Sequence, residues 1–209
     1  MKAQEPDPLT KILSDNISGS SELTSMLNNY FLKNSNNINL IRHSVVLASR
    51  ELKHFSSVKN YLHSLNQIIK KGNLDVLKNF LMKYDKEEDI KCSVITNMFL
   101  ARYKNVNTIL TISRSGTLSK VLTLLRKKNN KLEVIVSESR PAFEGRLMAK
   151  SLLKSGIKVD LITDAMTGIY VQKCDAVIIG ADKILSNRNV VNKAGSLSLA
   201  LLCKAFGKP

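Results

Sequence analysis

The residue whose type and place point most directly to chemistry is Asp182. It follows the β-branched run 177–179, after a Gly-Ala pair. That run predicts a buried parallel strand, so Asp182 is expected beyond its carboxyl end, where open α/β sheets bind ligands. Asn192 and Lys193 come next, directly ahead of a helix predicted over residues 196–206. An amide and a cation there suit an anionic group, because free backbone N–H groups and the helix dipole point the same way. The pattern predicts a carboxylate beside a phosphate-type pocket.

A second candidate phosphate site lies after the strand predicted over residues 108–112. Ser113, Arg114, Ser115 and Gly116 follow that strand and precede a predicted helix. Hydroxyl groups, a guanidinium and free backbone amides in this position can hold a phosphate. The spacing is not that of a Walker loop. Arg114, Ser115 and Gly116 are therefore predicted to contact a phosphorylated ligand.

Three further charged residues follow predicted strands, and each has two possible roles. Arg140 precedes a proline that restricts the loop and can aim the guanidinium at a ligand, or it can form an ion pair with Glu138. Asp164 can bind a ligand or cap the next helix through its carboxylate. Lys193 can pair with a phosphate or with Asp182. Polar groups at four successive strand ends nevertheless predict one convergent site.

The elements that must position these residues alternate between short apolar strands and amphipathic helices after residue 107. This alternation predicts a parallel, doubly wound, Rossmann-like sheet with right-handed crossovers. Strands are expected over residues 108–112, 132–136, 159–162 and 176–179, and helices over residues 118–128, 146–155, 165–173 and 196–206.

The first half of the chain reads as a helical domain without chemistry of its own. Residues 1–18 are predicted to be flexible, residues 19–104 to form the helical domain, and residues 105–209 to form the ligand-binding domain. Helices are expected from Ser20 to about Phe31 and over residues 38–52, 57–69, 74–84 and 90–103, with a charged turn at 85–89. The fold class is thus α/β, with an N-terminal helical domain followed by the sheet domain.

Composition excludes several classes of protein. The 209 residues contain no apolar run long enough to cross a membrane, and the first residues are not a signal peptide, so a cytoplasmic protein without membrane contact is expected. Cys92, Cys174 and Cys203 lack metal-ligand spacing, and an odd number implies no disulfide framework. No metal or cofactor is expected.

The net charge of +15 favours anionic partners, such as phosphorylated metabolites, nucleotides or nucleic acid. Nucleic acid is weakly supported, because the chain has no Trp and only 5% aromatic residues to stack on bases.

Over about residues 105–209, the strand-end motifs resemble a known superfamily. It comprises the α, β and δ subunits of translation initiation factor 2B, methylthioribose-1-phosphate isomerase and ribose-1,5-bisphosphate isomerase. The resemblance implies an N-terminal helical domain and a Rossmann-like domain that usually forms the dimer. It also implies a sheet domain that is short at its C-terminus, because family members continue beyond Pro209. The motifs are Glu138-Ser-Arg-Pro141 with Gly145-Arg146, Ile162-Thr-Asp164, Gly180-Ala-Asp-Lys-Ile184 and Asn192-Lys-Ala-Gly195.

In the isomerases of this superfamily, a cysteine and an aspartate form the acid–base pair that converts a phosphorylated aldose to its ketose. The resemblance places the aspartate at Asp182 and the cysteine position at Ser113, and Glu144 stands where the isomerases often have glutamine. The substrate-holding positions fall on Arg140, Asn192 and Lys193.

The serine changes the expected function. A thiol titrates near pH ~8.5, whereas a serine hydroxyl is a much weaker acid that needs an activating base, and this half of the chain has no histidine. The first hypothesis is therefore an initiation-factor-2B-like regulatory protein that binds a sugar phosphate or nucleotide and forms a homodimer or pairs with related subunits. The alternatives are an aldose–ketose isomerase of a phosphorylated ribose and a basic RNA- or ribosome-binding protein.

Overall fold

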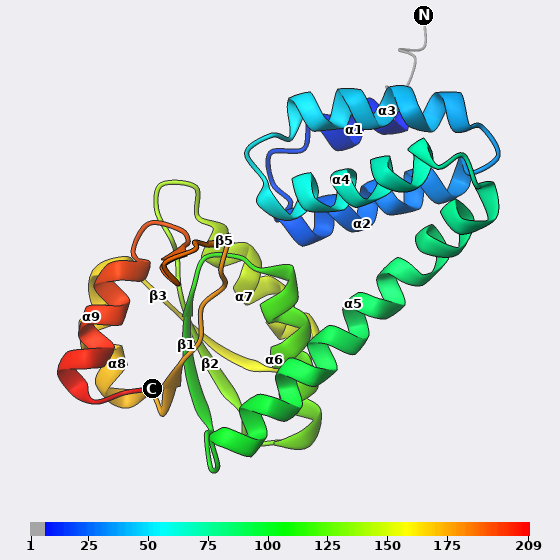
Figure 1. The fold of residues 1–209 in the computed structure, drawn as a ribbon. Coiled ribbons are helices and arrows are strands. Elements are labelled where there is room, and N and C mark those ends of the chain that lie inside the picture. Colours follow the sequence, from blue (N-terminus) through cyan, green and yellow to red (C-terminus); the bar gives the residue numbers. More distant parts are fainter. Residues whose placement is uncertain (1–6) are drawn as a thin grey trace, which may run out of the picture. The chain divides into compact units, whose positions relative to one another are not determined.

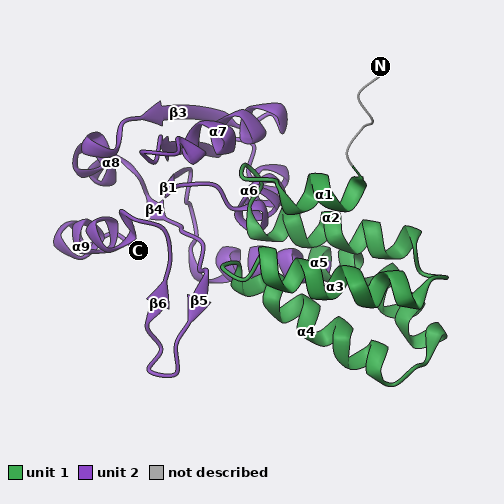
Figure 2. Ribbon diagram, turned by 90° about the horizontal axis from the view of Figure 1, so that it is seen from above, with its two compact units in different colours: residues 1–89 green, residues 90–209 purple. Residues whose placement is uncertain are grey.

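The computed structural model describes residues 7–209, which form two compact units, residues 7–89 and 90–209 (Figure 2). The first six residues of the predicted flexible N-terminus lie outside the described residues. The rest of that segment includes a helix, α1 (Pro8–Leu13), which the sequence analysis did not predict. The Asp7 carboxylate caps α1, and Leu9 and Ile12 are buried in the core of the first unit. Two apolar side chains three residues apart, on one face of the helix, are enough to anchor it within a polar stretch.

The first unit is a bundle of helices, as expected. Its helices are α1, α2 (Ser20–Lys33), α3 (Ile38–Glu51), α4 (Ser56–Lys70) and the first part of α5 (Leu74–Arg102). Their apolar faces meet in one core, inside which Tyr61 donates a 2.9 Å hydrogen bond to Asn28. Asn28 in turn donates to the carbonyl oxygen of Leu81 at 3.0 Å, so the buried polar groups are paired.

The charged turn predicted at residues 85–89 is wrong, because α5 runs unbroken from Leu74 to Arg102. The segment contains Lys and Glu residues, which favour helix, and has neither Gly nor Pro to end one. Charge density alone is thus a poor sign of a helix end.

The second unit has a parallel sheet between two layers of helices (Figure 1). The strand order is β3-β2-β1-β4, which confirms the predicted α/β class with a parallel sheet. Helices α6 and α7 pack on one face, and α8 and α9 on the other. The bounds are β1 (Thr108–Ile112), α6 (Gly116–Lys128), β2 (Glu133–Ser137), α7 (Glu144–Lys154), β3 (Lys158–Ile162), a 3₁₀ turn η1 (Asp164–Met166), α8 (Thr167–Lys173), β4 (Ala176–Val177) and α9 (Ser196–Phe206).

The last strand differs from the prediction. β4 ends at Val177 instead of Ile179, although the Ile178 amide still donates to the Leu110 carbonyl at 3.1 Å. The chain then forms an antiparallel hairpin of β5 (Lys183–Ile184) and β6 (Val190–Val191), which was not predicted. The hairpin carries the loop that leads into α9, so it helps to position the end of the candidate site. Among the described residues, no helix is long and apolar enough to span a membrane.

Candidate functional site

Ser113 lies directly beyond β1 and is held by two neighbouring segments. Its amide donates a 2.7 Å hydrogen bond to Ser139 Oγ, and its hydroxyl donates to Glu144 Oε2 at 3.0 Å. The residue is buried, with 4% exposure, and has a positive φ of 60°. The carboxylate that the sequence analysis did not find for this serine is therefore Glu144, the first residue of α7.

Lys193 pairs with the same carboxylate. Its Nζ lies 2.7 Å from Glu144 Oε1, while the side chains keep 45% and 28% exposure respectively. This contact is neither of the two roles predicted for Lys193. We call Ser113, Glu144 and Lys193 the serine–carboxylate–lysine network. It joins the ends of β1, of the β2–α7 loop and of the hairpin segment at the carboxyl edge of the sheet.

The start of α6 lies against the chain that leaves β4. Ser115 caps α6, because its Oγ accepts a 3.2 Å hydrogen bond from the Leu118 amide. A methyl group built on Gly180 would lie 3.5 Å from Ser115 Oγ and 3.8 Å from Asn192 Oδ1. The side chains of Ser115 and Asn192 therefore both face Gly180, and the predicted convergence extends to them.

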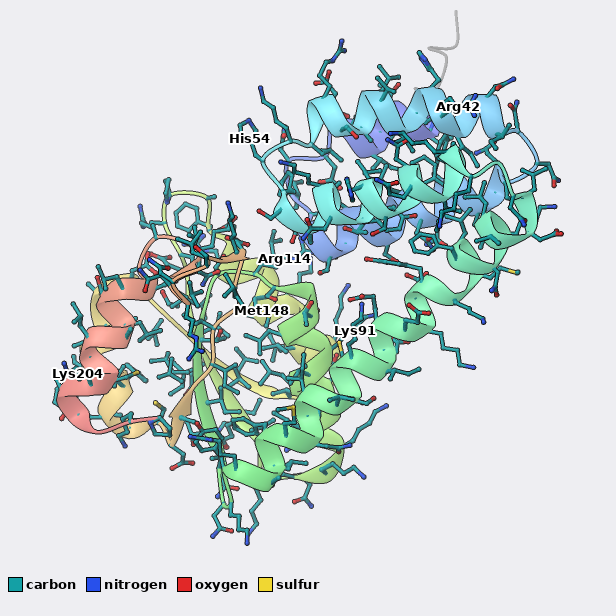
Figure 3. All side chains as sticks on the ribbon, in the orientation of Figure 1. Arg42, His54, Lys91, Arg114, Met148 and Lys204 are labelled. Carbon is teal, nitrogen blue, oxygen red and sulfur yellow. The ribbon has the colours of Figure 1, made fainter. Side chains whose placement is uncertain are left out.

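Other predicted residues lie at the same edge. Gly116 is the first residue of α6, and Arg114 lies at the end of the sheet toward which β1 runs (Figure 3). Asn192 donates a 2.9 Å hydrogen bond to Ser196 Oγ at the start of α9, which fixes its amide. These segments therefore lie at the edge of the sheet where the strand ends were expected to meet, and ligand binding by them stays a prediction.

Arg140 forms the ion pair that was its alternative role. Its Nε lies 3.0 Å from Glu138 Oε1, and Arg146 Nη2 lies 2.9 Å from the other carboxylate oxygen. Both guanidinium groups also lie over the Phe143 ring. The distance from the guanidinium carbon to the ring centre is 4.7 Å for Arg140 and 4.0 Å for Arg146. Arg146, and then Arg140, hold the pKa of Glu138 below its ordinary value. The Arg140 side chain remains 66% exposed, so a contact with ligand stays a prediction.

Asp164 holds the loop after β2 and does not cap a helix. Its carboxylate accepts hydrogen bonds from the Ser137 hydroxyl, from the Ser139 amide at 2.8 Å and from the Arg140 amide at 2.7 Å. The N-cap of η1 is Thr163, which makes no side-chain capping bond, so the predicted capping role is wrong. Through Ser139, this carboxylate indirectly positions the amide of Ser113.

Replacing Asp164 with asparagine is expected to lower stability in a pH-dependent way. Burial raises the pKa of Asp164. The hydrogen bonds from the Ser137 hydroxyl and the two amides together lower it by more, so the folded-state pKa is below the ordinary value. Its stabilisation is therefore complete above the unfolded pKa of about 3.9 and is lost as pH falls through the folded pKa. Asp164→Asn should cost roughly 1.5–3 kcal/mol at neutral pH, since a charged acceptor is lost.

Urea unfolding at neutral pH and at about pH 3 measures this effect, because only the first condition retains the full contribution of the carboxylate. The exposed Asp160→Asn on β3 is the matched control and should change little at either pH. An Asp164→Asn deficit of the same size at both pH values would contradict the assignment.

Asp182 lies between β4 and β5 and is exposed. Its amide donates to the Val191 carbonyl at 2.9 Å, which starts the hairpin. Among the described residues, no hydrogen bond or ion pair joins Asp182 to the serine–carboxylate–lysine network. Residues 7–209 also contain no group of three His, Cys, Asp or Glu side chains that could hold a metal ion.

Three of the five non-glycine residues with a positive φ in the described part of the chain lie at this edge. Ser113, Ser139 and Phe143 have φ values of 60°, 59° and 55°, in the left-handed region that non-glycine residues rarely adopt. Such residues persist where the surrounding contacts hold them, and they cluster at functional sites. These strained residues are therefore a further reason to assign the functional site to this edge of the sheet.

Comparison with known proteins shows which family the chain belongs to. A sequence model of the initiation factor 2 subunit family matches residues 15–209. Methylthioribose-1-phosphate isomerase of Thermosipho melanesiensis is 36% identical over 154 residues, which cover 66% of this chain and 43% of that relative. The chain thus spans less than half the length of this curated relative.

Solved structures show the same fold. The translation initiation factor eIF-2B of Pyrococcus horikoshii matches 96% of this chain and 74% of its own, with a TM-score of 0.73 and 26% identity. A chain of the tetrameric eIF2B β2δ2 complex from Chaetomium thermophilum matches all of this chain and 75% of its own, with a TM-score of 0.74 and 17% identity. The second likeness concerns the fold alone.

Proposed function

Because the chain belongs to the initiation factor 2 subunit family, we propose that it binds a sugar phosphate or a nucleotide at the carboxyl edge of its parallel sheet and acts as a regulatory protein of the initiation-factor-2B type. The observation that carries this proposal is the serine–carboxylate–lysine network. It brings a hydroxyl, a carboxylate and a cation from three segments to one place. Such a set of fixed polar groups at a strand edge suits recognition of a small polar ligand.

The phosphate would be held by groups at the start of α6. The backbone N–H groups of Gly116 and Thr117, the Arg114 guanidinium and the helix dipole favour a bound anion. Ser115 uses its hydroxyl oxygen to cap α6, so its part is to order this N-terminus. The Asn192 amide lies close by, across Gly180, and can donate to or accept from the sugar. The high positive charge of the chain adds long-range attraction for such a ligand.

A second candidate function is aldose–ketose isomerisation of a phosphorylated ribose, and one observation favours it. Glu144 accepts the hydroxyl hydrogen of Ser113, so the serine has an adjacent carboxylate acceptor. Ser113 and Asp182 would then act as the acid–base pair. A carboxylate is a weak base for a serine hydroxyl, which makes proton transfer slow. Binding without efficient turnover is therefore the first candidate.

The proposal extends to partners and location. A homodimer, or a complex with related subunits, fits a fold shared with a chain of a tetrameric initiation-factor complex. A role in translation initiation would place the protein in the cytoplasm.

A thermal-shift titration of the 209-residue chain tests the proposal. The ligands are ribose 5-phosphate, methylthioribose 1-phosphate, ribose 1,5-bisphosphate and AMP, each at low and moderate salt, with unphosphorylated ribose as the control. At least one phosphorylated ligand should raise the melting temperature saturably, because a ligand that binds only the folded state stabilises it by about 2.7 kcal/mol at 100 times its Kd.

Two outcomes would count against the proposal. One is a cooperative melt that no phosphorylated ligand shifts. The other is a shift that ribose produces equally well. A shift that disappears at moderate salt would favour non-specific charge attraction, and with it the nucleic-acid alternative.

A further inference from the structure

Glu144 is already committed to two partners on its two oxygens. The Ser113 hydroxyl donates to Oε2 at 3.0 Å, and Lys193 Nζ lies 2.7 Å from Oε1. The only cation of the network is therefore neutralised by a carboxylate of the protein itself. The Lys193–Glu144 pair as a whole therefore carries no net charge.

A phosphate placed against Lys193 would also lie against the Glu144 carboxylate. Like charges brought together in a partly desolvated site repel strongly, which lowers affinity for any ligand that needs this arrangement. Both side chains are only partly exposed, at 28% for Glu144 and 45% for Lys193, so water screens the repulsion incompletely.

The same carboxylate favours a neutral group. A sugar hydroxyl can donate to Glu144 in the way that the Ser113 hydroxyl does, and Lys193 can donate to the sugar oxygen. The position therefore suits a hydroxyl-bearing part of the ligand, with its phosphate elsewhere at the sheet edge.

We propose that Glu144 determines the specificity of the site. It favours a sugar monophosphate, and it excludes a ligand that would place a second phosphate beside Lys193. This inference rests on the proposed function and adds the charge class of its ligand. Selectivity arises from a repulsive element as well as from attractive contacts, as is common in specific sites.

Isothermal titration of wild type and Glu144→Gln with ribose 5-phosphate and ribose 1,5-bisphosphate tests the inference. Glutamine keeps the size and the oxygen acceptor for Ser113 but releases Lys193 from its ion pair. Wild type should bind the monophosphate on the order of 10-fold more tightly than the bisphosphate, and the variant should gain a similar factor for the bisphosphate alone. The monophosphate should gain no affinity in the variant, because its hydroxyl meets no repulsion in wild type and would donate to a neutral oxygen in place of a charged one.

Glu133→Gln is the matched control. Glu133 also pairs with a lysine, Lys158, at 2.8 Å, but it begins β2 at the opposite end of the strand from the site. Its substitution adds the same charge to the chain and should leave both affinities unchanged. Unfolding curves of the two variants show that each is folded.

The outcomes separate this inference from the proposed function. Equal binding of both ligands by wild type, or an equal gain for both in Glu144→Gln, would overturn the role of Glu144 while leaving ligand binding intact. If neither wild type nor Glu144→Gln binds either ribose phosphate, the role of Glu144 falls together with the sugar-phosphate form of the proposed function.

Discussion

Gly145→Ala should prevent the sheet-containing unit from folding. The methyl group would lie 1.8 Å from the carbonyl oxygen of Ser137, 2.8 Å from its carbonyl carbon and 3.0 Å from that of Glu138. All three atoms belong to the backbone at the end of β2, so no side chain can swing aside. The Gly145 amide also donates to the Glu138 carbonyl at 3.2 Å, which holds the start of α7 against the strand. The cost should exceed about 4 kcal/mol, the range reserved for severe backbone clashes and overpacking.

Gly168→Ala is the matched control for this change. A methyl group there would meet only Leu202 Cδ2, at 3.8 Å, and Gly168 lies within α8. Alanine in that helix should keep the fold and add up to about 1 kcal/mol of stability. Urea unfolding followed by circular dichroism compares the two. A Gly145→Ala protein that unfolds at nearly the wild-type urea concentration would contradict the close packing of α7 on β2.

Ser113→Cys should produce aldose–ketose isomerase activity that wild type lacks or shows only weakly. A thiol titrates near pH ~8.5 and exchanges protons far more readily than a serine hydroxyl. The side chain is already held at the edge of the sheet by the Ser139 contact to its amide. Restoring a general acid–base group of this kind should raise the rate on the order of 10²–10⁴-fold. Conversion of methylthioribose 1-phosphate and of ribose 1,5-bisphosphate, followed by proton NMR, measures it.

Ser113→Ala, which removes the hydroxyl without adding a thiol, is the control and should stay inactive. Adding Glu144→Gln to Ser113→Cys should raise the rate further, because a carboxylate beside a thiol disfavours the thiolate. A folded Ser113→Cys protein that binds the sugar phosphate but turns none over would exclude the isomerase as the second candidate function.

The parallel sheet was predictable because each strand is a short apolar run followed by a helix of its own. That regularity also places Ser113, Ser115 and Lys193 at one edge, although no local pattern links them. The hairpin could not be predicted, because its strands are two residues each and their side chains are exposed. Such short segments have neither the alternation nor the burial that marks a strand.

The ion pair between Lys193 and Glu144 could not be predicted from the sequence. Lys193 and Glu144 are 49 positions apart, and the sequence analysis noted Glu144 only as a departure from the isomerases. Glu144 lies at the first position of α7, directly after the loop that follows β2. This place near a strand end was the sign in the sequence that it belongs to the site. An ion pair of this kind depends on how two loops meet at the sheet edge, which periodicity does not determine.

The most direct test of ligand binding at the sheet edge uses the protein's nine glycines as reporters. A protein labelled with ¹⁵N only in glycine gives one amide signal for each, during titration with ribose 5-phosphate and then with AMP. Saturable shifts are expected at Gly116, at Gly180 and at Gly195, which directly precedes α9. Gly72, in the first unit, and Gly156, between α7 and β3, should not move. Shifts confined to those two control glycines, or no saturable shift at any glycine, would contradict the account.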